Sequence, residues 1–316
     1  MVGGAAIVSF VVAFIVLRVI LWRFARHALD LPNERSLHER PVPRTGGIAV
    51  VLGALAAAVL GAAELWLPMA LALLLAVISF VDDVRGIPTA ARLLVHLAAG
   101  AAFVWYMLSP MNLLEMALLI LAVAWITNLY NFMDGSDGLA GGMAVIGFAA
   151  YGIASAGPLS TISFALAAAS MAFLIHNFHP ARIFLGDVGS IPLGFLAAAL
   201  GIQGWRDDAW PLWFPLLVFA PFIGDATLTL IKRLVRGEKV WQAHREHYYQ
   251  RMVRMGLGHR RTALVGYAVM AACAGFALAG RGQAPLVQAA CFGAGAALLA
   301  ALAMWVDMRW RRSAAA

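Results

Sequence analysis

The chain has 316 residues, of which 63% are apolar and 12% are charged, and its mean hydropathy is +0.83. These values exclude a soluble globular domain and indicate a polytopic integral membrane protein with an all-α fold. The net charge of +7 does not indicate nucleic-acid binding, because basic cytoplasmic loops attracted to anionic lipid headgroups account for such an excess. Both cysteines lie in apolar segments, so no disulfide framework or zinc site is predicted.

A membrane-spanning helix needs about 20 mostly apolar residues, and we expect about eleven such helices in a single domain that covers residues 1–316. They are predicted at 3–24, 46–63, 65–81, 91–109, 112–130, 140–156, 159–177, 191–204, 210–231, 262–280 and 284–306. The first is expected to be a retained span and not a signal peptide, because its apolar run is long and no small-residue cleavage site follows it.

The basic residues predict the orientation, because cytoplasmic loops are rich in Lys and Arg. With the N-terminus in the periplasm and the C-terminus in the cytoplasm, the outer loops hold only Arg206 and Arg281, while Arg26 and Arg35 are among the many basic residues inside. Cytoplasmic loops are then expected near 25–45, 82–90, 131–139, 178–190 and 232–261. Five polar motifs lie in or beside these loops: Asp82-Asp83, Asn128 to Gly138, Phe184 to Ser190, Asp225, and His244 to Arg251.

Carboxylates are costly beside membrane spans, so their presence indicates chemistry. Asp82 and Asp83 directly follow an apolar run, and adjacent carboxylates repel each other unless a cation or proton lies between them. This pair suits Mg²⁺, although two solvated carboxylates beyond a helix end would give the same pattern. Asp187 lies between two glycines, which suits a metal ligand with exposed backbone amides nearby. The alternative is that the same residues form only a loop, with Ser190 as the cap of the helix that follows.

The segment from Asn128 to Gly142 (NLYNFMDGSDGLAGG) is strongly polar and lies between two apolar runs. Asn128 and Asn131 are one helical turn apart, and Asp134 and Asp137 each precede a glycine that lets the backbone turn tightly or approach a ligand. One Asp-Gly turn alone is usually only a turn, but two of them beside two asparagines favour a bound ligand. An EF-hand is excluded, because no glutamate occupies its closing position.

The first cytoplasmic loop, from Asp30 to Gly47, is rich in proline, glycine and charge, which predicts an irregular structure. Its basic residues are either solvated or in contact with phosphate. They are Arg35, His38, Arg40 and Arg44.

The longest cytoplasmic loop carries the motif HREHYYQR. His244 and His247 lie on one face if this stretch is helical. Together with Arg245 they favour contact with a diphosphate over zinc binding, because no third zinc ligand with standard spacing is present. Asp225, about two helical turns before Lys232, either belongs to the same site or pairs with a basic side chain.

Taken in order, four motifs resemble a known family: DDVRG at Asp82, NLYNFMDGSDGLA at Asn128, FLGDVGS at Phe184 and AHREHYYQR at Ala243. They are similar, over about residues 30–261, to the polyprenyl-phosphate N-acetylhexosamine-1-phosphate transferases, the superfamily of WecA and MraY. That family transfers a sugar 1-phosphate from a UDP-sugar to a polyprenyl phosphate, usually undecaprenyl phosphate in bacteria, and releases UMP. The resemblance implies Mg²⁺ as cofactor, with Mn²⁺ as an alternative, a bacterial inner-membrane location and a homodimer.

The resemblance also implies a role for each matching position. Asp82 and Asp83 would be the catalytic pair, and Asp187 would bind Mg²⁺ directly with Asp83 beside the ion. Phe184 would stack on uracil. The other matching residues would contact the nucleotide, the sugar or the phosphates: Asn128, Asn131, Asp134, Asp137, Arg44, Thr45, His244, Arg245 and His247.

The HREHYYQR loop differs from the histidine cluster of the peptidoglycan-precursor and enterobacterial common-antigen enzymes, and it resembles the O-antigen-initiating, WbpL-like branch. That branch implies lipopolysaccharide or other surface-glycan synthesis from a UDP-linked 6-deoxy-N-acetylamino sugar, such as N-acetylfucosamine or N-acetylquinovosamine. A donor of UDP-N-acetylglucosamine, or a peptidoglycan-precursor substrate, is the alternative. A transporter is the alternative from another class, but it would place polar residues near the bilayer midplane and often repeat its halves, and neither pattern is found.

Two mechanisms remain open for the implied reaction. Either a lipid phosphate oxygen attacks the sugar-linked phosphorus in line, with Asp83 removing or orienting its proton, or a covalent aspartyl phosphate forms first. The polyprenyl chain is expected to enter from the bilayer, along a groove lined by helices around the fifth and ninth apolar segments.

Overall fold

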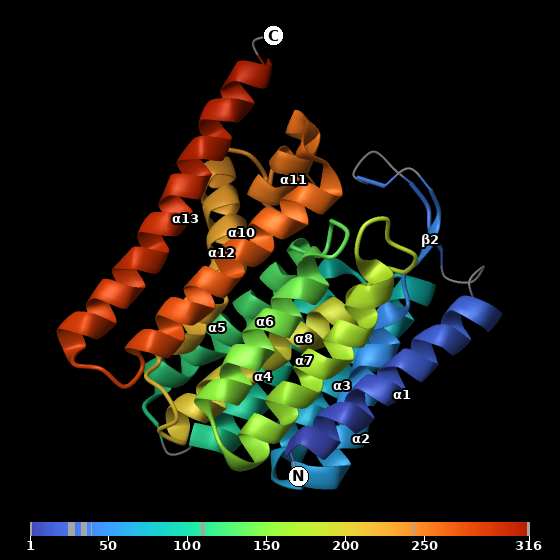
Figure 1. The fold of residues 1–316 in the computed structure, drawn as a ribbon, viewed down its shortest axis with the longest axis vertical. Helices are drawn as coiled ribbons and strands as arrows, with labels where there is room; N and C mark the ends of the chain where they lie inside the picture. The colour runs from blue at the N-terminus through green and yellow to red at the C-terminus, as the bar shows by residue number, and fades with distance from the viewer. Residues whose placement is uncertain are drawn as a thin grey trace.

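The computed structural model describes residues 2–24, 29–32, 37–38, 40–108, 111–242 and 244–314, so Arg26 and Arg35 lie outside the described residues. The helices of the N-terminal two thirds are α1 (Val2–Arg23), α2 (Gly46–Gly61), α3 (Trp66–Arg85), α4 (Thr89–Leu108), α5 (Leu113–Phe132), α6 (Leu139–Ala154), α7 (Gly157–Asn177) and α8 (Asp187–Arg206). They are followed by α9 (Trp213–Val218), α10 (Ala220–Val235), α11 (Tyr248–Met252), α12 (Gly258–Gly280) and α13 (Pro285–Ala314). The long helices form one bundle, with α12 and α13 along one flank (Figure 1).

Each apolar segment predicted as a span coincides with a helix. Within the described residues, eight helical stretches are long and apolar enough to cross a membrane, while α2 and α6 are shorter at 16 residues each. The ninth predicted segment is divided at Phe219 into α9 and α10. The protein is therefore a predominantly helical, polytopic membrane protein, whereas the count of eleven spans and the orientation stay predictions.

The helix α8 was expected to be short, at 191–204, but it has 20 residues and is the most buried of the eight candidate spans. It begins earlier because Gly186, at φ 70° and ψ 170°, turns the chain directly into the helix at Asp187. Ser190 is therefore inside the first turn and does not cap the helix, contrary to one of the two expectations. The hydroxyl of Ser190 instead donates to the side chain of Asn131 in α5.

A close backbone approach joins the start of α2 to the start of α8. The Gly46 and Gly47 amides donate to the Phe184 and Leu185 carbonyls, each at 2.9 Å. A Cβ on Gly47 would overlap the backbone of Gly189, so only glycine allows this contact. The glycines expected to keep this loop irregular thus form the first turn of α2 and bring the first loop against α8.

The first loop is also less irregular than expected, because a short antiparallel ladder joins β1 (Leu29–Asp30) to β2 (Val42–Pro43). This two-residue pairing is the one departure from an all-α fold in the part of the chain that the structure describes. The ladder, the loops before α6 and α8, and α11 all lie at the end of the bundle opposite the N-terminus (Figure 1). The predicted convergence of the polar motifs at one end is therefore confirmed.

Candidate active site

Two arginines hold the acidic pair at the end of α3 and the first residue of α8 together. Arg92 in α4 places Nη1 2.9 Å from an oxygen of Asp82 and 3.3 Å from an oxygen of Asp187. Arg44, just before α2, places Nη2 3.4 Å from Asp83. Because like charges repel strongly where water is scarce, the two guanidinium groups stabilise this gathering of carboxylates. In the sequence Arg92 is only one of the many basic residues that predict the orientation, and no motif indicates this role.

A fourth carboxylate, Asp134, lies beside this group in the turn between α5 and α6. Burial and the negative charge of Asp187 raise the pKa of Asp134, although a hydrogen bond from the Gly186 amide opposes the shift. Asn131, one turn earlier, accepts the Ser190 hydroxyl at 2.6 Å. The motifs that begin at Asn128 and Phe184 are thus in direct contact.

These groups border a polar pocket of about 300 Å³. Six residues predicted from the sequence line it: Arg44, Asn131, Asp134, Asp137, Phe184 and Asp187. His38 and Phe184 meet there edge to face, with ring centroids 4.9 Å apart. Asp82 and Asp83 do not line the pocket, but their arginine partners hold them at its edge. An aromatic ring beside several carboxylates and a guanidinium group suits a nucleotide diphosphate accompanied by a cation.

Two histidines that sequence analysis missed hold Asp137 in place. His179 Nδ1 lies 2.7 Å from an Asp137 oxygen, and the ring of His179 stacks on that of His259 with centroids 5.4 Å apart. His259 lines the pocket, accepts the Asp137 amide at Nδ1, and donates from Nε2 to the Leu37 carbonyl. Neither ring belongs to one of the four motifs; the only sequence signal is the spacing of three between His176 and His179, the same as between His244 and His247.

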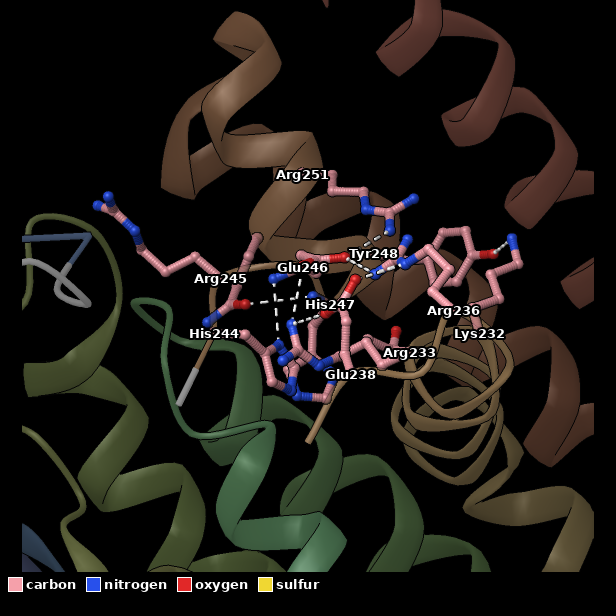
Figure 2. Close-up of polar contacts among 12 residues, drawn as sticks. Lys232, Arg233, Arg236, Glu238, His244, Arg245, Glu246, His247, Tyr248 and Arg251 are labelled. Carbon is pink, nitrogen blue, oxygen red and sulfur yellow. Dashed lines mark hydrogen bonds and ion pairs between the residues drawn. The ribbon is translucent and has the colours of Figure 1, made fainter. Parts of the chain in front are cut away.

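The histidine loop is organised by Asp225 of α10. The Asp225 carboxylate accepts the Tyr248 amide at 2.8 Å and the Tyr249 amide at 2.9 Å, and it lies 3.3 Å from His247 Nδ1. It therefore satisfies the free amides at the start of α11 and does not pair with Lys232. Figure 2 shows His244 and His247 side by side, with ring centroids 4.9 Å apart.

The condition for a shared helical face is not met, because α11 begins only at Tyr248 and residues 244–247 are not helical, yet the two rings still lie together. Burial, together with the nearby His247 and Arg233, lowers the pKa of His244 to about 4. His244 is therefore neutral near pH 7. A neutral ring contacts phosphate only as a hydrogen-bond partner.

Several predicted residues do not line the polar pocket: Thr45, Asn128, His244, Arg245 and His247. Asn128 lies one turn below Asn131 and bonds His96 Nδ1 at 3.2 Å and the Ala124 carbonyl at 2.7 Å. His247 stacks on Phe132 with centroids 6.3 Å apart, which brings the loop to the end of α5.

Next to the polar pocket lies an apolar groove of about 290 Å³. It is lined by residues of α10, α12 and α13, and by Met133 just beyond α5. Met133 and Tyr249 line the groove, while their chain neighbours Asp134 and Gln250 line the polar pocket, so the two cavities adjoin. The ninth apolar segment lines this groove, as expected, but no residue of the fifth segment (112–130) does; Met133 lies beyond its end, and α12 and α13 supply much of the wall.

The oxygen donors at this site suit Mg²⁺, which is usually held by one or two carboxylates together with substrate phosphates and water. Burial, followed by the charge of Asp187, raises the pKa of Asp134, and a nearby cation would favour the charged form of this carboxylate. Among the described residues no three His, Cys, Asp or Glu side chains form a metal-binding group by themselves. The residues therefore fit an ion that the substrate helps to hold, with Asp187 and Asp83 as the protein ligands proposed below.

Comparison with known proteins agrees with this chemistry. Residues 65–205 match the family described as glycosyl transferase family 4. A probable undecaprenyl-phosphate N-acetylglucosaminyl 1-phosphate transferase of Bacillus subtilis is 29% identical over 77% of this chain and 74% of its own length. A decaprenyl-phosphate N-acetylglucosaminephosphotransferase of Mycobacterium leprae is 31% identical over 76% and 73%, respectively. A phospho-N-acetylmuramoyl-pentapeptide-transferase of Synechococcus is 31% identical over 54% and 57%.

The chain belongs to glycosyl transferase family 4. The Bacillus subtilis and Mycobacterium leprae relatives transfer phosphosugars to polyprenyl phosphates, by their names, and the protein is accordingly a transferase of that general class. Together with the eight candidate spans, the bacterial relatives indicate a multi-pass bacterial membrane protein. The O-antigen branch and the sugar donor stay predictions.

Proposed function

We propose that this protein transfers an N-acetylamino-sugar 1-phosphate from a UDP-sugar to undecaprenyl phosphate, with Mg²⁺, at the cytoplasmic face of the bacterial inner membrane. One observation carries the proposal: a polar pocket edged by carboxylates and arginines adjoins an apolar groove. The pocket suits the UDP-sugar, and the groove suits the apolar chain of the second substrate. The two reacting phosphates would meet where the cavities adjoin.

In the proposed reaction an oxygen of the lipid phosphate attacks the sugar-linked phosphorus, the bond from that phosphorus to the bridging oxygen breaks, and UMP leaves with the oxygen. Asp83, held by Arg44, would accept or orient the proton of the lipid phosphate. Arg44 and Arg92 would offset the negative charge of the two substrates. A bound Mg²⁺, which Asp187 and Asp83 would hold, would neutralise charge on the diphosphate.

The donor sugar is open between two classes. The names of the relatives favour UDP-N-acetylglucosamine, whereas the HREHYYQR loop favours a UDP-linked 6-deoxy-N-acetylamino sugar and thus an O-antigen pathway. The peptidoglycan-precursor donor is included because of the Synechococcus relative. A homodimer is part of the proposal only through the family resemblance.

The test is UMP release by purified protein in detergent with Mg²⁺ and undecaprenyl phosphate. Each donor is offered separately: UDP-N-acetylglucosamine, UDP-N-acetylfucosamine, UDP-N-acetylquinovosamine and UDP-N-acetylmuramoyl-pentapeptide. We expect release with one donor class, and we expect Asp187→Asn to reduce the rate at least about a hundredfold, because removing a preorganised electrostatic group costs that much.

The matched control is Asp207→Asn, which removes a carboxylate at the other end of α8, where Gln203 contacts it. Its rate should equal that of the unaltered protein. Folded protein that releases no UMP with any donor would contradict the proposal. A phosphorylated aspartate trapped with donor alone would replace direct attack by the two-step mechanism.

A further inference from the structure

A third cavity, of about 650 Å³, opens between the ends of α10 and α13 beside α11, and neither substrate has been assigned to it. Its polar lining is mostly basic. The basic residues are Lys232, Arg236, Arg251, Arg254 and Arg311, and the acidic residues are Glu246 and Asp307. Five cations against two carboxylates leave an excess of three positive charges in the lining, 5 − 2 = 3.

Both carboxylates in this cavity are already engaged. Asp307 lies 2.6 Å from Lys232 Nζ and 3.0 Å from Arg251 Nη1. Glu246 pairs with Arg236 and lies 3.6 Å from Arg251 Nη2 (Figure 2). These pairs order the basic side chains around the cavity. They leave no acidic lining residue to neutralise the other basic side chains of the lining.

The remaining cations lack such partners. Neither Arg254 nor Arg311 forms an ion pair with a carboxylate among the residues that the structure describes. Arg254 donates from Nη1 to the Arg245 carbonyl at 3.1 Å and stacks over the Trp310 ring at 4.9 Å, so no acidic group offsets its charge. Arg251 is 6% exposed, and its buried Nε has no hydrogen-bond partner in the described part of the chain. A partly enclosed site with unpaired guanidinium groups attracts an anion, and guanidinium groups match phosphate oxygens in geometry.

The walls beside the cavity are apolar and exposed. On α10, Ile231 and Val235 line the cavity and are 50% and 81% exposed. On α13, Met304 and Met308 are 60% and 56% exposed, and each lies three residues before a lining residue, Asp307 or Arg311. The helix α13 is also the least buried of the eight candidate spans, so its surface faces the lipid. A ligand that satisfied both the cations and these walls would carry an anionic head and apolar chains.

We propose that this cavity binds an anionic phospholipid of the surrounding bilayer. The headgroup phosphate lies among Arg251, Arg254 and Arg311, and the acyl chains lie along the exposed faces of α10 and α13. Basic pockets between membrane helices recognise lipid headgroups in this way, and an aromatic ring such as that of Trp310 is typical of the membrane interface.

The site is distinct from the groove proposed for the lipid substrate. The Tyr248 side chain lines that groove, and its hydroxyl contacts Lys232 and Asp307, which belong to this cavity. Tyr248 thus stands between the two. A free phosphate ion would use the cations but would leave the apolar walls without a partner, so the structure favours the lipid.

The experiment is native mass spectrometry of the full-length protein in detergent, titrated with phosphatidylglycerol, phosphatidylcholine, undecaprenyl phosphate or inorganic phosphate. The test variant carries Arg254→Gln and Arg311→Gln. The matched control carries Arg309→Gln and Arg312→Gln, which remove the same charge from the end of α13 but do not line the cavity. All four positions are exposed, so both variants should keep the unfolding temperature of the unaltered protein.

We expect phosphatidylglycerol to bind more tightly than phosphatidylcholine. Each cation near a membrane surface contributes about fivefold to the affinity for anionic lipid, so the test variant should lose about 25-fold and the control should not. Equal losses in both variants, or equal binding of the two phospholipids, would overturn the proposal. Displacement by equimolar inorganic phosphate would assign the cavity to a soluble anion, and loss of undecaprenyl phosphate binding in the test variant but not in the control would assign it to the substrate; either result would also overturn the proposal.

Discussion

Arg92 shows how one side chain acquires its role from two distant contacts. In the sequence it is one of many arginines in or beside the predicted cytoplasmic loops. Its spacing to Asp82 and Asp187 predicts no contact, because the contacts form only when α3, α4 and α8 pack together. Asp225 is a similar case, because its contacts are backbone amides of α11, which no residue type predicts. Residue identity thus predicted that these groups are polar and that placing them beside membrane spans costs free energy, but it did not predict which partners they contact.

A pH effect is expected at His244. The folded pKa is about 4 and the ordinary value is 6.5, so between these two pH values the unfolded chain binds more protons at this position than the folded chain. Stability therefore falls as the pH is lowered from about 6.5 to 4. His244→Gln should make this fall less steep, as measured by thermal unfolding in detergent across that range. Parallel curves for the two proteins would show that His244 is not held neutral by its surroundings.

Hydropathy located the helices well but misplaced some of their ends. The start of α8 was expected four residues late, because its first turn, from Asp187 to Ser190, is polar and does not count as apolar span. The break between α9 and α10 at Phe219 was not predicted either, because the sequence remains apolar across it. Apolar composition reports where a segment can meet lipid, whereas helix ends depend on local backbone geometry and tertiary contacts.

The contact between α2 and α8 gives a prediction for this pair of elements. Gly47→Ala should lower the free energy of unfolding by about 1–3 kcal/mol, because its Cβ would overlap the backbone of Gly189, which cannot rotate away. UMP release should also fall, because Arg44 and Asp187 flank this contact. Gly3→Ala in α1 is the control, since its Cβ has nothing within 4 Å. Thermal unfolding of both variants gives the comparison, and equal midpoints would contradict the prediction.

At the scale of the whole molecule, the two substrate cavities are joined by neighbouring residues. Met133 and Asp134 face different cavities, as do Tyr249 and Gln250. This arrangement lets a polar donor and an apolar acceptor approach the same carboxylates from different sides. It depends on α10, α12 and α13 packing beside the rest of the bundle (Figure 1).

A bulky residue in the groove should change the KM for the lipid substrate but not the KM for the UDP-sugar. Gly224→Leu fills the groove wall of α10, where the nearest neighbour of an added Cβ is Leu299 at 3.7 Å. The KM for undecaprenyl phosphate should rise about tenfold, since lost apolar contacts cost about a kcal/mol or more, while the KM for the UDP-sugar stays unchanged. Gly275→Leu, on α12 but outside the groove, is the control. Unchanged kinetics for both substrates in Gly224→Leu would place the lipid elsewhere.

The sequence by itself determined the membrane class, the helical segments and the set of polar residues, because transfer of charge into lipid is so costly that each retained carboxylate stands out. It also indicated the family, through four motifs in order. Only the tertiary structure decided that Arg92 and Arg44 hold the acidic group, that His179 and His259 support Asp137, and that Asp225 caps α11. Those contacts join residues far apart in the chain, and their geometry follows from helix packing and glycine contacts that no local pattern encodes.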